Sequence, residues 1–289
     1  PNMYQVNDAF VKPETLREDL VRGIPGLSYA LRENSRQGLQ CDLFTSHAWS
    51  EGLFEFTDAV VQAWPAECQG AYVCVFSNPQ NLGHLLSRMI MTPQDSPFYR
   101  VLSCRPQQML MVANCSVPIH ARLWCVYEAH CARVMDVPVE VAGDPSQFAT
   151  DGRRMKAASR AIRKAVEARI LERAIEDASE EAASDFDIIA AGIYSTRCKK
   201  MLKRARPKTE KAMKSMQDAL DVRKATCSNA DDEVAIRREI SGQADHINAM
   251  VCDLLVRDQL KRAPKRSCKL TWYWGQDMVE GVAMMLGWQ

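Results

Sequence analysis

The chain has 289 residues, of which 47% are hydrophobic and 25% are charged, and its formal net charge is +1. A chain of this length and hydrophobicity can bury one large core or two smaller ones. The nearly balanced charge excludes a strong global attraction to nucleic acid or to anionic membranes. No apolar run approaches the roughly 18 residues that span a bilayer, and the first residues lack the pattern of a signal peptide. We therefore expect a soluble protein without a transmembrane segment.

Eleven cysteines are scattered from Cys41 to Cys268, an odd number without any Cys-x-x-Cys pair. Most lie in apolar stretches, as Cys74 does, where cysteine acts as a small core hydrophobe. This usage predicts an intracellular, reducing compartment, and we expect the cytoplasm. The chain starts at Pro1 without a methionine, so an N-terminal targeting signal can be missing. The cysteines and the five histidines show no metal-ligand spacing, and we expect no metal site.

Residues 1–37 form the first part of the chain, an N-terminal arm. Pro13, Pro25 and Gly26 interrupt a segment of mixed polarity. This pattern predicts extended backbone with one short helix around Glu14–Arg22. We expect the arm to pack on a neighbouring element.

Strands alternate with helices over residues 38–147. Short apolar runs bounded by turn residues predict the strands, and Pro138 indicates that the last strand lies at an edge. Such alternation predicts a parallel sheet covered by helices on both faces. The predicted elements are a strand at 41–46, a helix that Ser50 caps and that covers Phe54 to Trp64, a strand at 71–76, helices at 82–89 and 98–103, a strand at 109–113, a helix that Ser116 caps and that runs to about Met135, and a strand at 137–141.

Residues 148–289 are expected to form an all-α extension. Beyond Gly143 the chain becomes rich in Ala, Arg, Lys, Glu, Met and Leu with helical periodicity, which places a boundary near residues 145–150. The C-terminal tail concentrates Trp272, Trp274 and Trp288, and we expect it to dock onto another surface. The predicted helices run over about 153–181, 185–204, 209–224 and 231–262.

The helix before the boundary carries the motif Arg-Leu-Trp-Cys-Val-Tyr-Glu at residues 122–128. Counting by three and four places Trp124 and Glu128 on one stripe, beside the apolar stripe of Leu123 and Val126. The carboxylate therefore borders the buried face. Partial desolvation there raises the pKa of a glutamate and prepares it for a polar ligand. The alternative is a solvated glutamate or half of a surface ion pair.

Three motifs occur in order: Leu-Phe-Thr-Ser at 43–46 followed by His-Ala-Trp at 47–49, Phe-Ser-Asn-Pro-Gln at 76–80, and the motif at 122–128. Together they resemble the Toll/interleukin-1 receptor (TIR) domain over about residues 38–145. More narrowly, they resemble TIR-like modules of protist and algal proteins, which carry a Ser-His-x-Trp turn and an Arg-x-Trp-Cys-x-x-Glu helix. The resemblance implies a flavodoxin-like sheet, in which ligands bind outside the carboxyl ends of the strands.

The resemblance also implies an activity. In the enzymatic branch of the family, the glutamate of the Trp-Cys-x-x-Glu helix splits NAD into nicotinamide and ADP-ribose, and here that residue is Glu128. A carboxylate suits this reaction because breaking the glycosidic bond develops an oxocarbenium-like cation on the ribose. NAD is then a substrate, and no cofactor is implied. Active TIR enzymes usually self-associate to complete the site.

Four residues are candidates for binding NAD. Trp49 or Trp124 can stack on the nicotinamide or the adenine, and Ser46 or His47 can bond to ribose or phosphate. Each has an alternative role. Trp124 can be a core anchor, Ser46 a turn residue, and His47 a hydrogen-bonding residue at the end of a strand.

A non-catalytic function competes with NAD hydrolysis. In that reading the sheet is a rigid platform, and the helical half with its aromatic tail binds a protein partner in a larger assembly. The loop after the second strand lacks the Arg-Asp and Pro-Gly character of the assembly loop in signalling TIR domains, which argues against receptor-type assembly. An enzyme needs an open pocket between Glu128 and the Ser46–Trp49 turn, whereas a scaffold can fill that space with side chains.

Two further candidate sites have simpler explanations. The basic run at 199–208 can grip phosphates of nucleic acid or lipid headgroups, but no aromatic residues for base stacking surround it. A solvated helix end explains the run, and we expect no nucleic acid partner. Cys125 as a nucleophile needs a positioned base. His120 and His130 lie on other helix faces, so we expect Cys125 in the core.

Overall fold

The structure is a computed structural model that describes residues 1–16, 27–34, 38–82, 92–143 and 220–262, with isolated residues between 160 and 218. One compact unit comprises Pro1–Phe148 and Leu220–Leu255, and a second comprises Ala149–Ala219 and Val256–Gln289. The candidate site lies in the first unit. Outside the described residues lie nearly all of the predicted helices at 82–89, 153–181 and 185–204, part of the helix at 209–224, and the aromatic tail.

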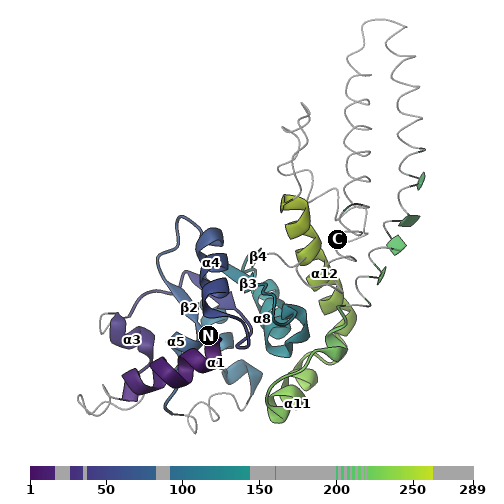
Figure 1. The fold of residues 1–289 in the computed structure, drawn as a ribbon. Helices are drawn as coiled ribbons and strands as arrows, with labels where there is room; N and C mark the ends of the chain where they lie inside the picture. The colour runs from purple at the N-terminus through teal and green to yellow at the C-terminus, as the bar shows by residue number, and fades with distance from the viewer. Residues whose placement is uncertain are drawn as a thin grey trace, which may run out of the picture. The chain divides into compact units, whose positions relative to one another are not determined.

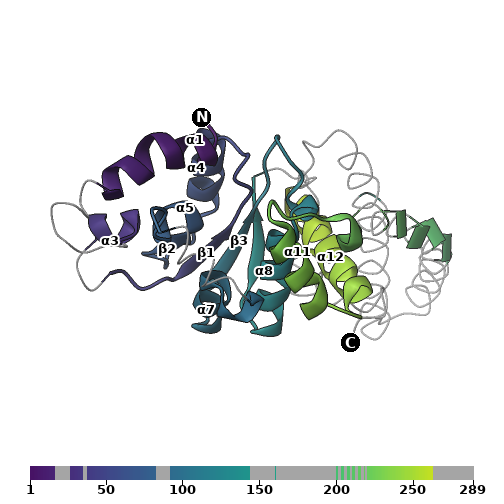
Figure 2. The same cartoon turned by 90° about the horizontal axis from the view of Figure 1, so that it is seen from below.

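The first unit is built on a four-stranded parallel sheet in the order β2-β1-β3-β4 (Figures 1 and 2). This topology confirms the predicted parallel sheet and is consistent with the flavodoxin-like strand order 2-1-3-4-5. Among the described strands β4 lies at an edge, as Pro138 indicated. The strands are β1 (Leu43–Ser46), β2 (Ala71–Val73), β3 (Gln108–Val112) and β4 (Val139–Ala142).

Helical elements flank the sheet (Figure 2). Among the described helices, none combines the length and the hydrophobicity that crossing a membrane requires. The elements of the described residues are α1 (Met3–Val6), the π-helical turn η1 (Asn7–Val11), α3 (Tyr29–Glu33), α4 (Leu53–Ala63), α5 (Cys74–Ser77), η2 (Pro93–Asp95), α7 (Pro97–Ser103), η3 (Ile119–Ala121), α8 (Leu123–Val134), η5 (Val222–Lys224), α11 (Ala230–Glu239) and α12 (Ala244–Arg262).

Helices cover both faces of the sheet, as the sequence predicted. Leu43 of β1 packs in one core cluster with Phe56 and Val60 of α4. Successive strand residues point to opposite faces, so Phe44 faces away from α4. Its ring stacks on Tyr72, which in turn meets Phe98 of α7. The face that carries Phe44 is also the face covered by α8, which fixes where Ser46 points.

The N-terminal arm packs on the sheet and the helices that cover it within residues 38–143, here called the sheet unit, but its helix begins earlier than predicted. Helical structure runs through residues 3–16 instead of beginning near Glu14. It starts at a capping box, in which Asn2 and Gln5 each satisfy the other's backbone N–H. Met3 and Val11 are fully buried in the same core cluster as α4, which confirms the expectation that the arm packs on its neighbours.

Two predicted helix starts on the sheet unit are wrong. α8 begins at Leu123, and not after Ser116, because the extended backbone of Arg122 pairs with Thr226 from the far end of the chain. The Leu123 N–H donates to the Thr226 carbonyl over 3.0 Å. In α4 the N-cap is Gly52 instead of Ser50.

Two predicted elements are divided. β2 stops at Val73, and Cys74–Ser77 turn into a short helix because the Ser77 hydroxyl accepts the Val73 N–H over 3.1 Å. The long helix predicted at 231–262 is split into α11 and α12 at Gly242, whose φ of 79° leaves the right-handed helical region.

Residues 220–255 pack against the sheet unit through α8. The indole N–H of Trp124 donates to Asp232 of α11 over 3.0 Å, and α11 contacts both α8 and η2. The sequence places this segment in the C-terminal extension, whereas in the structure it shares a compact unit with residues 1–148. Its buried apolar side chains are those of Leu220, Val222, Ala225, Ile236, Ile240, Ile247, Val251, Cys252 and Leu255.

Gly143, directly after β4, is a position where we expect alanine to be destabilising. Its φ is 77°, and a Cβ there would lie 2.4 Å from the carbonyl oxygen of Ala113. We expect Gly143→Ala to lower the free energy of unfolding by about 3 kcal/mol, of which roughly 1 kcal/mol is backbone strain. Gly242→Ala is the matched control, because its φ is 79° and nothing lies within 4 Å of its Cβ position. Equal losses for the two variants in urea titrations would show that the clash is absent.

Candidate functional site

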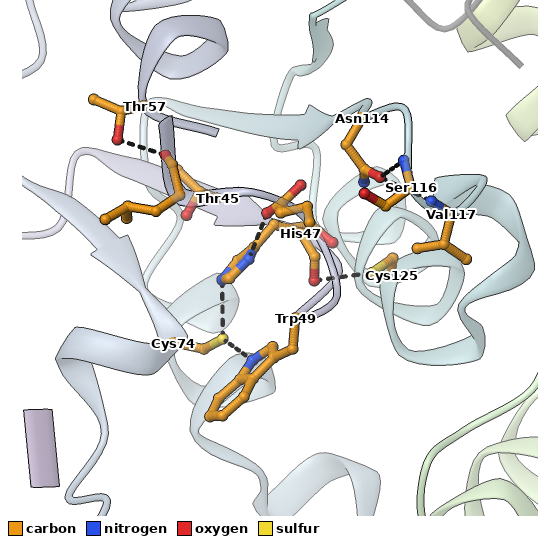
Figure 3. A network of polar contacts seen from close by, with 12 residues as sticks. Thr45, His47, Trp49, Thr57, Cys74, Asn114, Ser116, Val117 and Cys125 are labelled. Carbon is orange, nitrogen blue, oxygen red and sulfur yellow. Dashed lines mark hydrogen bonds and ion pairs between the residues drawn. The ribbon is translucent and has the colours of Figure 1, made fainter. Parts of the chain in front are cut away.

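The candidate site lies outside the carboxyl ends of β1 and β3. The strand order reverses between these two strands, and in open α/β sheets ligands bind in the crevice at such a point. β1 ends at Ser46, and Asn114 follows β3 closely. The Asn114 side-chain oxygen accepts the backbone N–H groups of Ser116 and Val117, each over 2.9 Å, and so shapes the loop before α8 (Figure 3).

Ser46 and Glu128 are in direct contact at this edge. Ser46 points to the α8 face, and its hydroxyl donates a hydrogen bond to the Glu128 carboxylate. Both side chains are buried, with exposed fractions of 1% for Ser46 and 6% for Glu128. Glu128 is therefore buried more deeply than its predicted place at the border of the apolar face. The reason is that the sheet covers α8 from one side while α7 and α11 cover it from others.

Burial makes Glu128 a weaker acid than an exposed glutamate. Removal from water raises the pKa of this carboxyl from its ordinary value of 4.5 to about 7, against the opposing effects of the Ser46 hydrogen bond and of nearby His47. A carboxyl with a pKa near neutral can hold positive charge when ionised and can also take up a proton from a reacting group.

His47 belongs to a second buried cluster beside this pair. Its Nδ1 lies 2.8 Å from the Glu51 carboxylate, and its Nε2 lies 3.1 Å from the Cys74 sulfur (Figure 3). Burial alone would lower the pKa of the imidazole, but Cys74 and Glu51 stabilise the protonated ring and raise that pKa to about 10. Burial also raises the pKa of Glu51, which His47 and Asn114 counteract.

The two candidate tryptophans already have partners within the chain. The Trp49 indole N–H donates to the Cys74 sulfur over 3.0 Å, and its ring packs on Tyr4. Trp124 donates to Asp232 and lies against the ring of Phe98, with centroids 5.1 Å apart. Of the five candidate residues, the structure thus brings Ser46 and Glu128 together, with His47 beside them. The NAD-binding roles of Ser46, His47, Trp49 and Trp124 stay predictions.

Cys125 is buried, as expected. Its thiol donates to the backbone carbonyl of His47 over 3.5 Å (Figure 3). Burial, and then the charge of Glu128, hold the pKa of the Cys125 thiol well above its usual range, which argues against a nucleophilic role. Within the described residues, no group of three His, Cys, Asp or Glu side chains is placed to hold a metal ion.

Sequence reasoning missed Glu51, Cys74 and Asn114. One local signal was present, because His47 and Glu51 are four residues apart and can meet on one turn. Cys74 carried no such signal, since it looked like one more apolar position of a strand. Its contact with His47 follows only from the pairing of β1 with β2, which aligns Thr45 with Val73.

Comparisons of the chain with protein-family models, with curated proteins and with solved structures return no match.

Proposed function

We propose that the chain is a TIR-like, flavodoxin-like NAD hydrolase that splits NAD into nicotinamide and ADP-ribose through Glu128. The observation that supports this most is the Ser46–Glu128 pair at the carboxyl edge of the sheet, where the strand order reverses. A carboxylate of raised pKa beside a hydroxyl at this edge is a combination that a structural role does not require. The motif order of residues 43–128 adds the resemblance to enzymatic TIR domains.

In the proposed reaction, ionised Glu128 binds the ribose hydroxyls next to the anomeric carbon. The bond between this carbon and the nicotinamide nitrogen breaks, the electron pair leaves with nicotinamide, and the carboxylate stabilises the positive charge left on the ribose. Nicotinamide departs as a neutral molecule, so no acid has to protonate it. A water molecule then adds to the anomeric carbon, and Glu128 accepts its proton.

NAD has to displace the Ser46 hydroxyl to reach Glu128, because both side chains are buried in this chain. We expect self-association, on which active TIR enzymes depend, to accompany this opening. The requirement has a practical consequence, since a dilute monomer would be inactive even if the proposal is correct.

Nicotinamide release is the test. Concentrated protein with a crowding agent is incubated with NAD, and free nicotinamide is followed by chromatography. We expect release that rises with pH through about 7, because the ionised carboxylate is the active form, and that falls at least ~100-fold in Glu128→Ala. Glu67→Gln, at an exposed carboxylate, is the control and should release nicotinamide like the wild type. Equal turnover in Glu128→Ala would reject the proposal.

An interaction module is the second candidate, and the burial of the pair favours it. The space between Glu128 and the turn after β1 is filled by direct contacts in the described residues, as a scaffold allows. In that case Glu128 only fixes α8 to β1. If concentrated protein with the crowding agent releases no nicotinamide, the interaction module is supported over the enzyme. The next experiment would then be to identify a protein partner.

A further inference from the structure

The cluster of His47, Trp49, Glu51 and Cys74 has a chemistry that NAD hydrolysis does not use. β1 and β2 are parallel neighbours that end at the same edge, so the residues directly after them meet (Figure 3). Cys74 follows β2, and the turn after β1 supplies the other three side chains. All three titratable residues are buried: the exposed fraction is 6% for His47, 0% for Glu51 and 8% for Cys74.

The hydrogen-bond directions in this cluster favour a negative sulfur. An indole N–H can only donate, so the Cys74 sulfur accepts from Trp49 at 3.0 Å. The Glu51 carboxylate, 2.8 Å from Nδ1 of His47, keeps a proton on that nitrogen. Nε2 of the same ring faces the sulfur at 3.1 Å. When the thiol proton moves to Nε2, the sulfur is a thiolate that accepts two N–H donors, and the imidazolium lies between two anions.

We propose that Cys74 is an oxidation-sensitive thiol, which His47 activates by taking up its proton and Trp49 by donating to its sulfur, and which hydrogen peroxide converts to a sulfenic acid. The thiolate sulfur attacks one peroxide oxygen, the S–O bond forms, and the O–O bond breaks. The departing hydroxide takes the Nε2 proton of His47 and leaves as water. The sulfur is oxidised by two electrons and the peroxide is reduced by two. Cys74 keeps 8% of its surface exposed, and hydrogen peroxide is a small oxidant.

The other titratable groups near the cluster do not reverse this assignment. Tyr72, on β2, is buried, and burial keeps its pKa well above the usual range, so it stays neutral. Glu128, on α8, favours the imidazolium of His47, as Glu51 does, once it is ionised above a pH of about 7, and it is neutral below. On α4, Phe56 packs against the His47 ring with centroids 4.8 Å apart and brings no charge, and the charge of Glu55 acts on Glu51, whose pKa it raises.

Cys115 is a matched comparison within the same chain. It is exposed, and its hydrogen bond to Glu55, with the charge of that carboxylate, raises the pKa of its thiol. Exposure alone would make Cys115 the more reactive of the two. The proposal predicts the opposite at pH 6.5, because His47 can take the Cys74 proton and Trp49 donates to the Cys74 sulfur, whereas the Glu55 carboxylate raises the pKa of the Cys115 thiol.

Site-resolved oxidation of the full-length protein tests the proposal. The protein is treated with hydrogen peroxide at pH 6–8, remaining thiols are alkylated under denaturing conditions, and fragment ions in mass spectrometry separate Cys74 from its neighbour Cys68. We expect Cys74 to be oxidised at least ~10-fold faster than Cys115 at pH 6.5, because the Glu55 carboxylate raises the pKa of the Cys115 thiol. Equal rates at pH 6.5 would overturn the proposal.

Two variants test the activating contacts. Trp49→Phe removes one donor and Glu51→Gln removes the charge that holds the imidazolium, and we expect each to slow oxidation of Cys74 at least ~5-fold at pH 6.5. Glu67→Gln should leave the rate unchanged. Circular dichroism shows whether each variant folds. If Glu51→Gln, at a fully buried position, does not fold, the Trp49→Phe variant still tests the proposal. An unchanged rate in a folded Trp49→Phe protein would refute the role of the indole. The readout is independent of NAD turnover, so the two proposals can fail separately.

Discussion

A Glu128→Gln variant is expected to be more stable than the wild type by about 3 kcal/mol at pH 8 and nearly equal to it at pH 4.5. The folded protein holds the Glu128 proton up to a pKa of about 7, whereas the unfolded chain releases it near 4.5. At about 1.4 kcal/mol for each pH unit, ionising this buried group lowers wild-type stability by roughly 3 kcal/mol. Gln resembles protonated Glu, and its carbonyl can still accept from Ser46.

The sign of the pH dependence follows from the raised pKa. The stabilising contribution of protonated Glu128 is fully present below pH 4.5 and is lost as the pH rises through 7. His47, whose pKa is also raised, adds a loss of stability at higher pH in both proteins, so the difference between variant and wild type is the relevant quantity. Urea titrations at several pH values measure it. A constant difference from pH 4.5 to 8 would contradict the buried ionisation.

This variant also separates a functional carboxylate from a structural one. A residue kept for stability should be stabilising when ionised, and its loss should be harmful. A variant that gains stability at pH 8 but loses nicotinamide release would mean that an unfavourable buried charge is retained for activity. A variant that loses stability would support the scaffold role of Glu128 instead.

Ile236→Ala is expected to lower the free energy of unfolding of the sheet unit by about 3 kcal/mol. Ile236 is fully buried on α11, the helix that covers α8, and truncation of such a side chain removes buried apolar area and leaves a cavity. A loss of this size would mean that residues 220–255 belong to the cooperative fold of the sheet unit. Urea unfolding followed by circular dichroism gives the value.

Val234→Ala, two residues away on the same helix, is the control. Val234 is 58% exposed, and we expect its replacement to change the free energy of unfolding by less than about 0.5 kcal/mol. If Ile236→Ala behaves like this control, α11 does not contribute to the stability of the sheet unit, and its packing on α8 is weak.

The spacing of apolar residues and the positions of turn residues were sufficient to predict much of the sheet unit. The four strands, their parallel arrangement, the helices on both faces and the edge position of the last strand follow from apolar runs, apolar periodicity and Pro138. Glu128 was placed on the correct helix for the same reason. These features depend on nearby residues alone. Apolar residues that recur every two positions in a strand, or every 3.6 in a helix, mark the face that a neighbouring layer covers.

The starts and ends of elements were harder to predict where distant segments determine them. Thr226 pairs with Arg122, so α8 begins later in the sequence than predicted, and no residue near Arg122 in the sequence indicates this contact. At β2, the Ser77 hydroxyl accepts the Val73 N–H, and the chain turns into α5 directly after that residue. Local propensity is weak enough for one such hydrogen bond to override it.

The sequence by itself determined the alternating α/β pattern, the burial of the strands and the helix that carries Glu128, since these depend on which residues prefer to leave water. Only the tertiary structure decided which polar side chains meet: Ser46 with Glu128, and His47 with Glu51 and Cys74. The pKa of Glu128 is likewise a tertiary property. It depends on the layers that exclude water around α8, and one of those layers, α11, comes from residues about a hundred positions farther along the chain.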